Sequence, residues 1–103
     1  YFALFALNLS IAGAAEEAPV YVDVRSWAEY QVDGIESDVQ IHYTDISSKI
    51  GEYVAHKDQP IAVYCAVGGR AEQARQTLIS EGYTNVTNLG GINDVKALRG
   101  LNE

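Results

Sequence analysis

The chain has 103 residues, of which 48% are hydrophobic and 20% charged, and its formal net charge is −7 at pH 7. This length suits one domain built around one apolar core. The acidic balance argues against nucleic acid and anionic membrane surfaces as partners, because both are bound through an excess of Lys and Arg. An anionic substrate would have to be attracted by local backbone dipoles and one or two arginines, against the overall field.

The first fifteen residues carry no charge and end in small residues just before Glu16 and Glu17. This profile is typical of a secretory signal, with its cleavage site at residues 12–14 or 13–15. A buried helix or a membrane anchor would be the alternatives, but the run is shorter than the roughly 20 apolar residues that span a bilayer. We therefore expect residues 1–15 to be a signal peptide, truncated at its start, and the mature domain to cover residues 16–103. Export would place the domain in the periplasm, and without export it would be cytoplasmic.

The predicted elements begin with a strand at residues 20–24, a β-branched and aromatic run. Ser26 and Glu29 then have the spacing of a capping box, which predicts a short helix. Partial alternation of apolar and polar residues indicates a short strand over residues 38–41.

A second helix is predicted from the apolar stripe of Ile46, Ile50 and Val54, which recur every fourth residue. Either Thr44 or Asp45 could cap its first turn.

The continuous apolar run of residues 61–65 predicts a strand buried on both faces. A helix over residues 71–81 follows, and Gly82 stands where a C-terminal glycine belongs. Residues 85–89 form the last predicted strand, and a glycine pair makes a tight turn before a closing helix over residues 92–98. This alternation implies an α/β domain with a mostly parallel sheet and helices on both faces.

The only cysteine, Cys65, ends the predicted central strand, where open parallel sheets bind their ligands. Gly68 and Gly69 allow the loop after it to curl closely, so that its N–H groups and the end of the next helix can converge on one point. A thiol at that point would have a pKa below the usual value of about 8.5 and would be a good nucleophile. The alternative is an inert core thiol at a strand end.

Three segments together resemble the single-domain rhodaneses, and in particular the short exported, phage-shock members of that family. They are Cys-x-x-Gly-x-Arg over residues 65–70, Asp-Val-Arg over residues 23–25, and Asn-Leu-Gly-Gly over residues 88–91. The resemblance covers nearly the whole chain after the leader. It implies a single rhodanese-like domain with thiosulfate sulfurtransferase activity and no metal or organic cofactor.

The resemblance also implies roles for individual residues. Cys65 would take the outer sulfur of thiosulfate, or of another small anionic persulfide donor, and pass it to cyanide or a thiol. The backbone that would stabilise both sulfur species belongs to Ala66, Val67, Gly68, Gly69 and Arg70. The protein is expected to be a monomer, without stable membrane insertion once the signal is removed.

The resemblance also bears on three charged residues, Arg70, Asp23 and Arg25. Arg70 could clamp the oxygens of the donor, or it could pair with an acidic neighbour. Asp23 and Arg25 are expected to brace the region of the loop rather than to touch sulfur.

Two departures from the family pattern bear on the donor. Ala66 stands where many relatives have a basic or polar residue, and residues 34–38 replace the usual His-x-x-Gly-Ala stretch. Both changes predict weak thiosulfate binding and favour another persulfide as the donor.

Two other functions remain as alternatives: a non-catalytic rhodanese-like interaction module, and a Cys-dependent phosphatase or arsenate reductase of related fold. The retained Cys65 argues against the first. Arg70 lies only five residues after Cys65, which leaves a tight loop for a phosphate and argues against the second. His42 and His56 stand apart and are expected at the surface rather than around a metal, and Trp27 is expected to be a core or capping aromatic.

Overall fold

The computed structural model describes residues 17–101, so the predicted signal peptide lies outside the described residues. Its centre is one sheet of four strands in the order β2-β1-β3-β4, in which every pairing is parallel. The strands are β1 (Val20–Asp23), β2 (Val39–Gln40), β3 (Ile61–Cys65) and β4 (Val86–Gly91). The predicted α/β class and the parallel sheet are confirmed.

Strand β3 lies inside the sheet, between β1 and β4, and all five of its residues are buried. This explains its uniformly apolar sequence, since side chains of a central parallel strand meet helices on both faces. Its last residue, Cys65, therefore emerges at the middle of the edge where the strands end.

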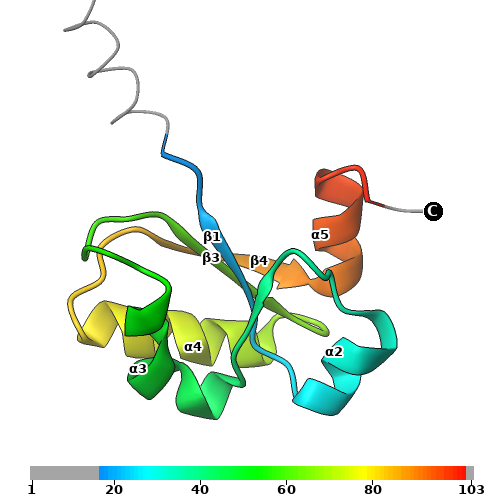
Figure 1. Ribbon diagram of the computed structural model, residues 1–103, viewed down its shortest axis with the longest axis horizontal. Coiled ribbons are helices and arrows are strands. Elements are labelled where there is room, and N and C mark those ends of the chain that lie inside the picture. The colour runs from blue at the N-terminus through cyan, green and yellow to red at the C-terminus, as the bar shows by residue number, and fades with distance from the viewer. Residues whose placement is uncertain (1–16, 102–103) are drawn as a thin grey trace, which may run out of the picture.

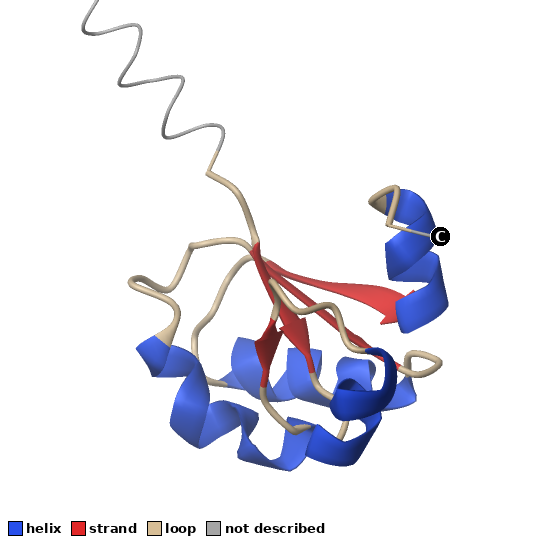
Figure 2. Ribbon diagram, turned by 45° about the vertical axis from the view of Figure 1, so that its right-hand side comes forward, coloured by secondary structure: helices blue, strands red, loops and turns tan. Residues whose placement is uncertain are grey.

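Helices cover both faces of the sheet, as predicted (Figures 1 and 2). Helices α3 (Ile46–Lys49) and α4 (Gly69–Ser80) pack on one face, over a core that includes Val22, Val63 and Leu78. Helix α5 (Ile92–Leu98) covers the other face, where Tyr64 and Val95 are buried. No helix within residues 17–101 is long and apolar enough to cross a bilayer.

Helix α2 (Trp27–Asp33) follows β1 and has the predicted capping box. The Ser26 Oγ accepts a hydrogen bond from the Glu29 N–H at 3.2 Å, and the Glu29 Oε1 accepts one from the Ser26 N–H at 3.0 Å. Two otherwise unpaired donors at the start of the helix are thereby satisfied.

Three strands differ from the prediction by one or two residues at their ends, and two helices also differ. The helix expected around Ile46 and Ile50 is broken into η1 (Tyr43–Asp45), α3 and η2 (Ile50–Glu52), although its apolar stripe is buried. Gly51 and the serines of this segment are poor helix formers, which accounts for the break. Helix α4 begins two residues earlier than predicted, at Gly69, and this brings its first turn against Cys65.

Candidate active site

Cys65 is buried, with 1% of its surface exposed, at the carboxyl end of β3. Only residues 66–68 separate it from α4, so the chain must turn sharply over the sulfur. Gly68 has φ +110°, a conformation that side chains disfavour, and its N–H donates a hydrogen bond to the Cys65 Sγ at 2.9 Å.

The N–H groups around the sulfur belong largely to the start of α4. The first N–H groups of a helix have no partner within it, because the first turn-to-turn bond here runs from the Glu72 N–H to the Gly68 carbonyl. Burial alone would raise the pKa of Cys65. The N–H groups of Ala71, Gly68, Val67 and Arg70 outweigh burial, and the pKa of the thiol is lowered from its ordinary value. The arrangement therefore favours a thiolate.

The end of β4 packs against the loop that follows Cys65. Cys65 lies opposite Gly91 after an irregularity in the register between β3 and β4. A Cβ on Gly91 would lie 2.3 Å from the carbonyl oxygen of Ala66, and one on Gly68 would lie 3.5 Å from the Cα of Gly90. Gly91 is thus required by close approach of the loop, and Gly90 is favoured by its φ of +89°, whereas the sequence predicted only a turn there.

Asn88 joins this end of β4 to the loop. Its Nδ2 donates to the carbonyl of Gly68 at 3.2 Å, and its Oδ1 accepts from the N–H of Gly90 at 2.8 Å. The sequence pointed to Asn88 only as part of a family motif. Its bracing role depends on how β4 sits beside α4, which local patterns do not reveal.

Arg70 pairs with an acidic neighbour, the second of the two roles considered for it. Its Nη1 and Nη2 donate to the Glu29 Oε1 and Oε2 at 2.8 and 2.9 Å. The pKa of Glu29 is lowered to about 2, chiefly by the Arg70 hydrogen bond, so Glu29 stays charged at neutral pH. The pKa of Arg70 is raised, chiefly by its hydrogen bond to Glu29 and to a smaller extent by the nearby Cys65 thiolate.

Asp23 and Arg25 form a buried pair at the end of β1, with side chains 0% and 4% exposed. The Arg25 Nε and Nη2 donate to Asp23 at 2.9 and 2.8 Å, and its Nη1 reaches Asp33 at the end of α2 at 2.8 Å. The pair holds α2 against β1. Its connection to the Cys65 loop runs through α2, where Glu29 binds Arg70.

A network that the sequence did not predict lies on the opposite face of the sheet. Tyr64, next to Cys65, donates its hydroxyl to the buried Asp38 at 2.6 Å, and Arg99 donates to the same carboxylate at 2.7 Å. Burial, and then the bond to Asp38, raise the pKa of Tyr64. Because these residues are far apart in sequence, no local pattern could have indicated their contact.

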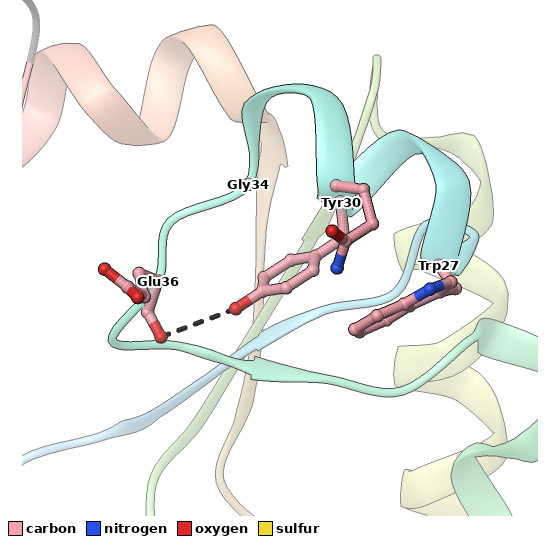
Figure 3. Close-up of a pocket in the computed structure, with 5 residues that line it drawn as sticks. Trp27, Tyr30, Gly34 and Glu36 are labelled. Carbon is pink, nitrogen blue, oxygen red and sulfur yellow. Dashed lines mark hydrogen bonds between the residues drawn. The ribbon is translucent and has the colours of Figure 1, made fainter.

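A hollow of about 480 Å³ lies beside α2 and is lined by Trp27, Tyr30, Gln31, Gly34 and Glu36 (Figure 3). Trp27 is 61% exposed, so of the two roles expected for it, core or capping aromatic, the core role is wrong. Its ring instead stacks on Tyr30, with ring centroids 5.6 Å apart. Gly34 has to be a glycine because a Cβ there would overlap the Tyr30 ring at 2.3 Å.

The two histidines bond to exposed polar side chains. His56 is exposed and contacts Asp58 and Glu17, and the His42 ring bonds to Thr44. Within residues 17–101, no three His, Cys, Asp or Glu side chains gather in a way that could hold a metal ion.

The sequence and the fold are both similar to those of known rhodanese-like proteins. The model of the rhodanese-like domain family matches residues 10–98. The chain is 32% identical over 92 residues to the thiosulfate sulfurtransferase PspE of Escherichia coli strain K12, covering 89% of this chain and 88% of that protein. Among solved structures, a rhodanese with anions from E. coli is similar with a TM-score of 0.71 and 32% identity, covering 75% of this chain and 91% of that one. The rhodanese-like domain of the Alr3790 protein from Anabaena has a TM-score of 0.72 and 28% identity, covering 81% and 78%.

Proposed function

Because the chain belongs to the rhodanese-like domain family, we propose that it is a sulfurtransferase that carries a sulfur atom on Cys65. The observation that carries the proposal is the ring of N–H groups that lowers the pKa of this buried thiol. Thiosulfate is the donor suggested by the name of the E. coli relative.

The reaction would proceed in two displacements at sulfur. The Cys65 thiolate attacks the outer sulfur of thiosulfate, a new S–S bond forms, and the bond to the sulfonate sulfur breaks with sulfite leaving with the electron pair. Cyanide or an acceptor thiolate then attacks the terminal sulfur of the Cys65 persulfide. This step releases thiocyanate or an acceptor persulfide and restores the thiolate, so that no external oxidant or reductant is needed.

The loop suits both states of the cysteine. Thiolate and persulfide each carry one negative charge close to the N–H groups of Gly68 and its neighbours, so these donors stabilise either one without rearrangement. Ala66 packs closely against Gly91, and α4 begins as early as Gly69. Both features direct the N–H groups of the loop toward the Cys65 sulfur.

The alternatives fit the site less well. A phosphate would need a wider loop and a free arginine, yet residues 66–68 turn tightly over the sulfur and Arg70 is held by Glu29. An interaction module would have no use for a thiol with a lowered pKa. Periplasmic location, removal of residues 1–15 and a monomeric state remain part of the proposal, and they rest on the leader sequence and on family resemblance.

The proposal is tested by incubating residues 16–103 with thiosulfate, removing the excess and recording the intact mass. We expect a gain of one sulfur atom, reversed by cyanide with release of thiocyanate. The Cys65→Ser variant should gain nothing, since Cys65 is the only cysteine in the chain. A wild-type mass that stays unchanged with thiosulfate and with other sulfane donors would rule the function out.

A further inference from the structure

The Glu29 carboxylate serves two purposes at once. Its Oε1 closes the capping box with Ser26 at 3.0 Å, and both of its oxygens bind the guanidinium of Arg70. The pair lies at the surface beside the Cys65 loop, with the Arg70 and Glu29 side chains 30% and 36% exposed. An approaching donor therefore meets a carboxylate and an arginine that are already bound to each other.

Both arginines near the loop are consequently paired with carboxylates before a donor arrives. Glu29 neutralises Arg70, and the two carboxylates of Asp23 and Asp33 surround Arg25. Neither arginine offers free positive charge, and the thiolate of Cys65 itself repels an anion. Attraction is left to the N–H groups. A dianion meets twice the repulsion of a monoanion from the thiolate and from the net charge of −7, and it costs more to remove from water.

We infer that Glu29 is a positioning residue that sets the charge of the accepted donor: by binding Arg70, it disfavours dianions such as thiosulfate and favours monoanionic sulfur donors, namely organic persulfides and thiosulfonates. The inference rests on the proposed role of Cys65 as the reacting group.

The Glu29→Gln variant separates charge from structure. Glutamine at the third helical position also completes a capping box, so α2 should keep its start. The amide oxygen still accepts one hydrogen bond from Arg70, but the negative charge is gone. Glu36→Gln is the matched control, since it removes the same charge from the exposed segment after α2, where the Glu36 side chain has no hydrogen bond among the described residues.

The first readout does not depend on sulfur transfer. Cys65 is alkylated with iodoacetate, a monoanion, and with iodoacetamide, its neutral analogue of similar size, and the two rates are measured by intact mass. Glu29→Gln should raise the ratio of the iodoacetate rate to the iodoacetamide rate by about three- to ten-fold, because one nearby charge acts partly through solvent. Glu36→Gln should leave the ratio unchanged, and the urea-denatured chain supplies the ratio of an unfolded thiol.

The second readout compares donors. Glu29→Gln should raise kcat/KM for thiosulfate relative to methanethiosulfonate, a monoanionic donor, by a similar factor. An unchanged or lower ratio in either readout, with the ratio still distinct from that of the denatured chain, would overturn the inference. If the alkylation ratio shifts while neither donor loads sulfur onto the wild-type protein, the proposed function fails, whereas the effect of Glu29 on the approach of anions to Cys65 is upheld.

Discussion

At the scale of single residues, the site depends on how its buried charged groups are stabilised. The Cys65 sulfur is buried, yet its anion is favoured because N–H groups of the loop and of α4 point at it. Asp23 is fully buried as well and is tolerated because Arg25 meets it with two nitrogens. The same rule covers both groups: a buried charge is stable only when donors or an opposite charge surround it.

This rule predicts the effect of Asp23→Asn. The change leaves the buried Arg25 charge facing an amide, and breaking a buried pair in this way typically costs about 3–5 kcal/mol in the free energy of unfolding. Urea unfolding followed by circular dichroism measures the loss. Asp58→Asn, which removes the exposed partner of His56, serves as the control and should leave stability nearly unchanged. Equal midpoints for the two variants would show that the buried pair does not hold β1 and α2 together.

At the scale of elements, the site is made where three segments end or begin together. Strand β3 delivers the thiol, the start of α4 supplies N–H donors, and the end of β4 supports the loop from behind. Asn88 and Gly91 contribute no chemistry of their own. They set the position of the loop, and through it the pKa of Cys65.

Gly91→Ala tests that support. The new Cβ would lie 2.3 Å from the Ala66 carbonyl, so the loop must move away from β4. We expect a loss of about 1–3 kcal/mol in stability and a rise in the pKa of Cys65, because the N–H groups no longer converge on the sulfur. Gly51→Ala, where nothing lies within 4 Å of the added Cβ, is the control: it should leave the thiol pKa unchanged and should not lower the stability. The account of β4 would be wrong if Gly91→Ala kept both the stability and the thiol pKa of the wild type.

At the scale of the whole molecule, the features that could be predicted from sequence are those that depend on local sequence patterns. The uniform apolar run of β3, the capping box of Ser26 and Glu29, and the glycines after Cys65 each need only a few neighbouring residues. Together with the alternation of elements they predicted the parallel sheet and the position of the thiol. The loop's tight turn follows from the same short segment.

The remaining features depend on packing between distant segments. Whether Arg70 faces a ligand or Glu29 is decided by how α2 lies beside α4, and the two residues are 41 positions apart. The bond from Tyr64 to Asp38 and the exposure of Trp27 likewise follow from tertiary arrangement. Local periodicity carries no information on such contacts, which is why both roles of Arg70 stayed open at the sequence level.

The measurement that tests the account most directly is the pH dependence of Cys65 alkylation by iodoacetamide, followed by intact mass. The rate follows the thiolate, so it should fall as the pH drops through a midpoint below the ordinary thiol value of about 8.5. The free energy of unfolding should depend on pH in the same direction. The stabilisation by the thiolate is fully present above the pKa of Cys65 in the unfolded chain, and it is lost as the pH falls through the pKa of Cys65 in the folded protein. Glu29, with a pKa of about 2, does not titrate in this range. A midpoint at or above the value of the urea-denatured chain would contradict the claim that the loop holds Cys65 as a thiolate.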